Sequence, residues 1–216
     1  MSPNADYFIS PSEARIVAHV CGDGYLCLYK RKRSKADLSS HRRKNIYRNI
    51  YLIGYCNLNK KLLNEFSNDV KKVYNLKTSF QKENNLRFEN KFVYERIKSL
   101  GGGSSKDWFI SNEIFLANKE VMCSWLRAFF DDEAFVEIDK NRICVNSVNK
   151  KGLLQVQALL HSVGVNETTF CGPYVYRGCI SYRLKVLQKS LLEYKSLINF
   201  IHPRKIYKLN KILAKP

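Results

Sequence analysis

Two acidic residues, Asp23 and Glu133, lie in segments of the same design in the two halves of the chain. The first segment reads IVAHVCGDG from Ile16, and the second reads LRAFFDDEA from Leu126. Each is an apolar helical stretch with a small residue third and the acid eighth, where a helix is expected to turn into a strand. Carboxylates favour hard cations such as Mg²⁺, and a bound cation can make water nucleophilic. Two such acids, if they met, would support metal-dependent hydrolysis.

The two expected helices have small residues where they could pack together. These are Ala18 and Gly22 in the first helix and Ala128 in the second. Small residues let helix backbones approach closely, so side-by-side packing would bring both acidic tips within reach of a shared cation. The alternative is that each segment is an ordinary buried helix followed by a surface acid. The same pattern at matching places in both halves favours the first interpretation.

Both halves have the same order of expected elements. In the first half we expect a helix at 12–22, strands at 25–33 and 47–55, a helix capped by Asn59, strands at 77–82 and 85–89, and a helix at 91–100. In the second half we expect a helix at 118–132, strands at 134–139 and 142–147, a helix capped by Asn149 with Leu154 buried, strands at 168–176 and 179–186, and a helix at 189–200. This order predicts an internal duplication. The expected protein is α+β, with one αββαββα repeat at 1–103, a linker at 104–117 and a second repeat at 118–216.

The charge of the chain favours a polyanionic partner. There are 37 Lys and Arg against 19 Asp and Glu, which gives a formal net charge of +18 and a pI near 9.6. Basic residues occur in both halves, so the charge does not come from a detachable tail. A basic globular protein with 12% aromatic residues most often binds nucleic acid, although a solvated basic surface is the alternative.

Other classes of protein are disfavoured. No apolar run approaches the roughly 20 residues of a membrane-spanning helix, and the first residues lack the regions of a signal peptide, so we expect a cytoplasmic protein. The seven cysteines form no CxxC pair and do not suggest a disulfide framework. The histidines show no zinc-like spacing, and His19, which lies in the first of the two expected helices, is expected to pack or to form a hydrogen bond.

Both segments resemble the LAGLIDADG motif of homing endonucleases, with Asp23 and Glu133 at the catalytic-acid position. The resemblance is to single-chain members and extends over nearly the whole length, including residues 108–110 and 200–205. It implies two fused repeats, with the motif helices at their interface and two antiparallel sheets forming a DNA-binding saddle. It also implies an intron-encoded or free-standing monomer that makes double-strand breaks in a long, asymmetric DNA target. The expected cofactor is Mg²⁺, or another divalent cation such as Mn²⁺.

The resemblance also assigns roles in the active site. Asp23 and Glu133 would bind the metal, together with the main-chain carbonyls of Gly22 and Asp132. Asn57, matched in the second repeat by Asn146 or Ser147, would orient water. Lys205 could supply a basic group near the scissile phosphate, although a solvated or phosphate-tracking lysine is an equal alternative. Asp131 is expected to cap or brace rather than to bind metal.

DNA contacts are expected on one face of each sheet, because side chains alternate along a strand. Leu26, Leu28, Ile143, Val145, Ile180 and Leu184 would form the core face. Arginine can pair with guanine, and Asn or Gln with adenine, in the major groove. Basic residues of the loop at 34–44 would hold phosphate. The predicted DNA-binding residues are Tyr29, Arg31, Arg33, Arg43, Lys77, Gln81, Arg87, Arg142, Asn146, Arg183 and Lys185.

Three functions are therefore in competition. A site-specific DNA endonuclease is the leading hypothesis, because a protein that only binds would gain nothing from holding two like charges together. An RNA maturase, with intron RNA as a possible partner, or a DNA-binding regulator on the same scaffold is the second. A basic structural protein of the ribosome would explain the charge but not the paired acids.

Overall fold

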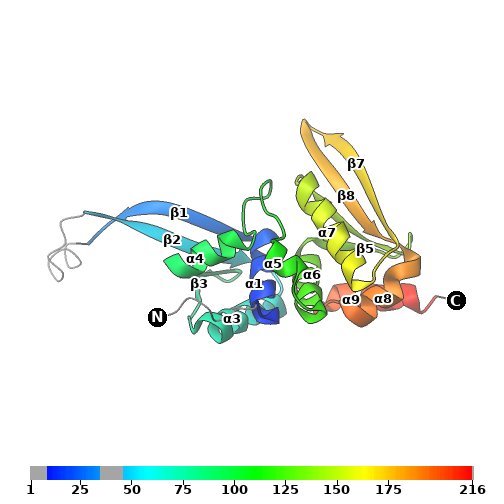
Figure 1. Cartoon of the computed structure of the whole chain (residues 1–216), viewed down its shortest axis with the longest axis horizontal. Helices are drawn as coiled ribbons and strands as arrows, with labels where there is room; N and C mark the ends of the chain where they lie inside the picture. The colour runs from blue at the N-terminus through cyan, green and yellow to red at the C-terminus, as the bar shows by residue number, and fades with distance from the viewer. Residues whose placement is uncertain (1–8, 35–45, 216) are drawn as a thin grey trace.

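Each half of the chain contains a four-stranded antiparallel sheet with helices packed against one face (Figure 1). This computed structural model describes residues 9–34 and 46–215. Most of the basic loop predicted at 34–44, including Arg43, lies outside the described residues. The two sheets have equivalent strand orders, β1-β2-β4-β3 and β5-β6-β8-β7. The predicted α+β fold of two similar αββαββα units is confirmed.

The first unit begins with α1 (Pro11–Cys21), which the Ser10 side chain caps by accepting a hydrogen bond from the backbone N–H of Glu13. Asn59 and Asn90 cap the two later helices in the same way. The elements of this unit are α1, β1 (Gly24–Lys32), β2 (Tyr47–Cys56), α3 (Lys60–Tyr74), β3 (Ser79–Lys82), β4 (Asn85–Glu89) and α4 (Lys91–Ser99).

The second unit repeats this order after a short helix in the linker, α5 (Asn112–Phe115). Asn118 and Asn149 cap its first two main helices. Its elements are α6 (Lys119–Glu133), β5 (Ala134–Glu137), β6 (Arg142–Ser147), α7 (Lys150–Val163), β7 (Thr168–Tyr176), β8 (Cys179–Val186), a 3₁₀ turn (Gln188–Ser190), α8 (Leu191–Leu197) and α9 (Pro203–Leu213).

The C-terminal region differs most from the prediction. The helix expected at 189–200 is a 3₁₀ turn followed by α8, which ends at Leu197 because Asn199 adopts a left-handed conformation with φ of 58°. Helix α9 was not predicted; Pro203 occupies its first turn, and Leu209 and Ile212 face the core. These two helices complete the second unit and carry Lys205 to the tip of α6.

Helices α1 and α6 lie side by side at the centre of the molecule, between the two units (Figure 1). Ala18 and Ala128 are completely buried there. A Cβ atom on Gly22 would lie only 2.8 Å from the Cβ of Asp132. The prediction that small residues allow close packing of these helices is confirmed, and the close approach places the two acidic tips together.

The linker is part of the core of the second unit. Trp108 is 3% exposed, and its carbonyl accepts a hydrogen bond from the Asn149 side chain at 2.6 Å. Its ring fills the space beside Gly152, where an added Cβ would lie 2.5 Å away. The linker therefore fixes where α7 begins and is not a free tether.

The strand registers confirm the predicted alternation of side chains near the helices. Ile53 pairs with Leu26 and faces the core, whereas Tyr29 pairs with Ile50 on the other face. Two residues assigned to the core face are nevertheless exposed, Leu28 at 53% and Ile180 at 51%. The strands β1, β7 and β8 extend beyond the helices of their units (Figure 1), and each has a run of exposed residues.

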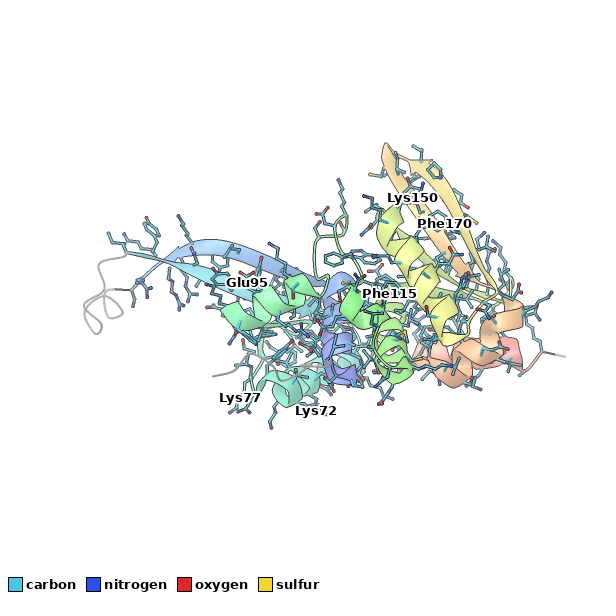
Figure 2. All side chains as sticks on the ribbon, viewed as in Figure 1. Lys72, Lys77, Glu95, Phe115, Lys150 and Phe170 are labelled. Atoms are coloured by element: carbon cyan, nitrogen blue, oxygen red, sulfur yellow. The ribbon has the colours of Figure 1, made fainter. Side chains whose placement is uncertain are left out.

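Two further expectations were wrong. Leu154 is 42% exposed, because α7 turns this position toward solvent while its neighbour Leu153 is buried. Lys77 lies in the connection that follows α3, before β3 begins at Ser79 (Figure 2). It therefore does not belong to a strand face. Within the described residues, no helix is long and apolar enough to cross a membrane.

Candidate active site at the tips of α1 and α6

Asp23 and Glu133 lie at the adjoining ends of the two central helices. Asp23 follows the C-cap residue Gly22, and its carboxylate accepts a hydrogen bond of 2.9 Å from the side-chain amide of Asn57. Burial and the negative charge of Asp132 raise the pKa of Asp23 to about 6. Burial and the charges of Asp23 and Asp132 raise the pKa of Glu133 to about 7. Burial is the largest cause of both shifts, and the neighbouring carboxylates add to it.

A third carboxylate, Asp132, lies behind these two acids. Its side chain is completely buried. Oδ1 accepts hydrogen bonds from the Tyr55 hydroxyl at 2.7 Å and from the Asn57 amide at 3.2 Å. Oδ2 lies 2.8 Å from Nδ1 of His19. Sequence reasoning assigned Asp132 only a main-chain role, although the run Asp131-Asp132-Glu133 was a visible signal of concentrated charge.

His19 forms a buried ion pair with Asp132. Burial alone would lower the pKa of His19, but the charge and hydrogen bond of Asp132, together with Glu65, raise it to about 9. Its other ring nitrogen lies 3.7 Å from Glu65, a distance suited to an ion pair but too long for a hydrogen bond. The expectation that His19 packs or hydrogen-bonds within the protein is confirmed, with a partner from the opposite unit.

Lys205 reaches the same place from α9. Its Nζ donates to the main-chain carbonyls of Phe130, Asp131 and Asp132 at 3.0, 2.5 and 3.3 Å. A cation at the C-terminal end of a helix is favourable, because the unpaired carbonyls there carry partial negative charge. Burial lowers the pKa of Lys205, although the surrounding acids oppose the shift.

Asp131 braces the backbone. Its carboxylate accepts from the N–H groups of Ile201 and His202 at 3.0–3.2 Å, which ties α6 to the start of α9. The bracing role that was expected for Asp131 is confirmed. A hollow of about 430 Å³ opens beside these groups; its lining includes Asp23, Asn57, Asp131, Asp132, His202 and Lys205.

Local geometry identifies the counterpart of Asn57. Asn57 Oδ1 accepts from the backbone N–H of the helix cap Asn59 at 2.8 Å. Ser147 Oγ accepts from the equivalent cap, Asn149, at 3.1 Å. Of the two residues left open by the sequence, Ser147 therefore matches Asn57, whereas Asn146 accepts from Arg183 on the outer face of the sheet.

The donor atoms at the tips suit a hard divalent cation. The carboxylates of Asp23 and Glu133 and the carbonyls of Gly22 and Asp132 offer oxygen ligands. Among the described residues, no group of three or more His, Cys, Asp or Glu side chains could hold a metal ion. Mg²⁺ commonly uses one or two carboxylates and completes its coordination with waters and substrate phosphates. The residues fit a cation that the protein would share with a phosphate substrate.

The strand positions predicted to bind DNA occupy the sheet faces away from the core, where several are already paired. Arg31 lies 3.6 Å from Glu89, and Arg142 pairs with Glu137. Arg87 lies opposite Gly54, and Lys185 opposite Cys144. Of the remaining positions, Tyr29 and Gln81 are exposed and Arg33 follows the end of β1.

Comparison with known proteins agrees with this architecture. Residues 120–199 match the family model of a LAGLIDADG-like domain. A crystal structure of I-DmoI in complex with DNA and Mn aligns over 88% of this chain and 96% of that one, with a TM-score of 0.61 and 18% identity. The I-LtrWI LAGLIDADG homing endonuclease, bound to its target DNA, aligns over 94% and 89%, with a TM-score of 0.57 and 10% identity.

The fold is that of a two-repeat LAGLIDADG protein. The full-length DUF199/WhiA protein from Thermatoga maritima has the same fold, with a TM-score of 0.57 and 13% identity over 95% of this chain and 61% of that one. No curated protein matches the sequence significantly. The LAGLIDADG fold is therefore shared with both endonucleases and WhiA, and the function must be argued from the site.

Proposed function

We propose that this protein is a site-specific homing endonuclease that hydrolyses both strands of a long, asymmetric DNA target. The observation that carries the proposal is the convergence of Asp23 and Glu133, one from each repeat, on the tips of two adjoining helices. Both acids have raised pKa values because burial and neighbouring carboxylates disfavour their ionised forms. Like charges held this close are costly unless a cation neutralises them during function.

In this proposal Asp23 and Glu133, with the carbonyls of Gly22 and Asp132, hold Mg²⁺ or Mn²⁺. A cation bound there would activate water and stabilise the charge that develops on the leaving oxygen. Asn57 positions Asp23 and presents its amide toward the hollow on the first-repeat side. Lys205 brings a positive charge to the tip of α6, close enough to attract a phosphate. One acid from each repeat suits the cleavage of two antiparallel strands.

The outer faces of the two sheets would bind the target DNA. The solved complexes of I-DmoI and I-LtrWI with DNA support DNA as the ligand by analogy of fold. The excess of 18 positive charges would supply non-specific attraction to phosphates. We propose that the protein acts as a monomer, because a single chain supplies both repeats. Its place would be the cytoplasm or the compartment that holds the host genome, and its gene would be intron-encoded or free-standing.

A protein that binds nucleic acid without cutting it is the second candidate. A fold does not by itself determine a function, so the scaffold shared with WhiA would also suit a DNA-binding regulator or a maturase that binds intron RNA. A binding protein has no need for an acid at both helix tips. The sharper expectation is therefore cleavage that depends on the two acids and on a divalent cation.

The test uses a plasmid that carries the uninterrupted sequence across the gene's flanking junction. Incubation with the full-length protein and Mg²⁺ should linearise this plasmid, whereas EDTA should prevent cutting. The Asp23→Asn variant should bind the same plasmid without cutting it. Specific binding by the wild type with no cleavage in Mg²⁺ or Mn²⁺ would favour the binding protein instead.

A further inference from the structure

The two helix tips differ by one carboxylate at a matched position. The residue before the acid is Gly22 in the first repeat and Asp132 in the second. The two face each other so closely that an added Cβ on Gly22 would lie 3.0 Å from Oδ2 of Asp132. A side chain at one position therefore excludes a side chain at the other. The arrangement breaks the symmetry of the repeats at the centre of the site.

The Asp132 carboxylate belongs by sequence to the second repeat but serves the first. Two of its hydrogen-bond donors, Tyr55 and Asn57, come from the end of β2 and the residue that follows it. The matching residues at the end of β6 are Val145 and Ser147. Val145, which matches Tyr55, has no polar side chain to donate a hydrogen bond. Gly22, which matches Asp132, has no carboxylate to accept one. Asn57 thus has an anchoring carboxylate, and Ser147 has no equivalent one from α1.

The anchor is held from behind by an ion network across the repeat interface. His19 contacts Asp132 Oδ2 and lies 3.7 Å from Glu65. Glu65 in turn accepts a hydrogen bond of 2.6 Å from Arg127 on α6. A buried carboxylate with three donors and a supported imidazolium partner has little freedom to rotate. Its position is therefore defined on the scale that catalysis requires.

We propose that the Asp132 carboxylate is a positioning residue that acts through Asn57 on the cleavage of one of the two DNA strands. This inference rests on the proposed endonuclease function. Asn57 donates to both Asp23 and Asp132, so the buried carboxylate fixes the amide and the amide fixes Asp23. Because Gly22 supplies no such carboxylate to Ser147, the strand served by the second-repeat side does not depend on this anchor.

Asp132 does not contact the substrate in this role. Its side chain is fully buried, and both oxygens accept hydrogen bonds from protein groups. Binding a cation through the side chain would require breaking the contacts with Tyr55 and His19. The carboxylate of Asp132 therefore supports the site, and only its main-chain carbonyl is placed to meet a metal.

The test measures the two strands separately. The substrate is a linear duplex of the uninterrupted junction sequence with a different dye on each 5′ end, cut by excess full-length protein in Mg²⁺. The Asn57→Ala variant first identifies which strand depends on the first-repeat side, and Ser147→Ala identifies the other. Asp132→Asn should slow the Asn57-dependent strand by about 10- to 100-fold and the other strand far less, so that nicked duplex accumulates.

A double variant tests whether Asp132 acts through Asn57. If it does, Asn57→Ala with Asp132→Asn should cut the dependent strand no more slowly than Asn57→Ala alone. Affinity for the duplex in EDTA should not change in any of these variants. Equal slowing of both strands, greater slowing of the Ser147-dependent strand, or multiplicative effects in the double variant would overturn the proposal. Wild-type protein that cuts neither strand would instead refute the endonuclease function.

Two further variants separate positioning from a loss of stability. Asp69→Asn removes a different buried acid, which lies on α3. Asp69 pairs with Arg15 at 2.6 Å and does not contact Asn57. It should lower the melting temperature and leave both strand rates unchanged. Tyr55→Phe removes one donor and keeps the Asp132 carboxylate, and it should slow the same strand by a smaller factor. This variant tests the proposal even if Asp132→Asn fails to fold, and no strand bias in a folded Tyr55→Phe protein would contradict it.

Discussion

Where α1 carries Arg15 and His19, α6 carries Trp125 and Phe129 at the matching positions of the repeated segment. The residues of α1 form ion pairs, Arg15 with a carboxylate of α3 and His19 with a carboxylate of α6. Those of α6 form an aromatic cluster, in which the rings of Trp125 and Phe129 stack at 5.0 Å and Trp108 packs against both. At matching positions of the two central helices, the first half therefore uses ion pairs and the second half uses aromatic packing.

The same contrast continues on the next pair of helices. Six residues after its N-cap asparagine, α3 has Glu65 and α7 has Gln155. Glu65 joins the ion network, whereas Gln155 makes a neutral pair of hydrogen bonds with the backbone of Ile110 in the linker. Four residues further on, Asp69 matches the fully buried Leu159. At these four matched positions of the helices, the first half has an ionic side chain and the second a neutral one.

This difference shows how a duplicated fold can support an asymmetric site. The ion pairs of the first half continue to the helix tips, because His19 contacts the Asp132 carboxylate there. The aromatic half extends instead to the linker, where Trp108 fills the space beside Gly152. Four predictions can break or sharpen this comparison.

The largest effect is expected from the two positions where the halves agree. Asp23→Asn and Glu133→Gln should each lower the rate of double-strand cleavage by roughly 10³-fold or more, because each replaces a carboxylate oxygen by an amide nitrogen and removes a negative charge from the cation site. Plasmid cleavage in Mg²⁺ measures the rate, and gel shift in EDTA measures binding, which should be largely retained. Full cutting by Asp23→Asn would refute the assignment of the site.

The next largest effect is expected from Lys205, which has no counterpart at the tip of α1 among the residues that the structure describes. Lys205→Met removes the ammonium group that contacts the last carbonyls of α6 and should slow cleavage by about 10²-fold. Lys211→Met, on the exposed side of the same helix, is the matched control and should cut at the wild-type rate. A wild-type rate for Lys205→Met would show that this lysine is only a structural cap.

The parts of this site that the sequence could predict are those with local signals. The acids of the two segments and the small residues Ala18 and Ala128 follow a short periodic pattern, and the asparagine caps mark where helices begin. The contacts of Asp132 could not be read in this way, because they join residues 77 and 113 positions apart. Such contacts follow from the packing of two complete units.

The errors have a similar origin. Alternation along a strand indicates which side chains share a face, but not where the covering helices end, so Leu28 and Ile180 were assigned to a core that does not reach them. The left-handed turn at Asn199 separates α8 from α9, and apolar spacing alone did not reveal it. The spacing of Leu209 and Ile212 after Pro203 was a usable signal for α9.

A smaller effect is expected from Gly22, the glycine of α1 that faces the Asp132 side chain. Gly22→Ala should reduce the free energy of unfolding by about 1–3 kcal/mol and weaken cleavage, because the new methyl group overlaps Asp132. In an Asp132→Gly background the same substitution should cost much less, since both the Cβ at 2.8 Å and the carboxylate beyond it are gone. Chemical denaturation of the four proteins measures this coupling. Additive losses would show that the two positions do not compete for space.

The smallest effect on cleavage is expected from Glu65→Gln, which gives α3 the residue that α7 has. Burial alone would raise the pKa of Glu65, but His19 and Arg127 outweigh it and bring the pKa to about 2, below its ordinary value of 4.5. Because the folded pKa is depressed, this carboxylate stabilises the protein above pH 4.5, and the contribution is lost as the pH falls toward 2. The contribution is at most on the order of 3 kcal/mol, and less where water reaches the 19% exposed side chain.

Thermal unfolding between pH 6 and pH 2.5 tests this expectation. The Glu65→Gln protein should melt below the wild type at pH 6, and the difference between their melting temperatures should shrink steadily as the pH falls. Gln155→Ala is the matched change in the other half. It removes uncharged hydrogen bonds, so the amount by which it lowers the melting temperature should not vary with pH in the same range. A constant deficit for Glu65→Gln would mean that the charge of Glu65 adds nothing to stability, and that the two halves differ in shape but not in electrostatics.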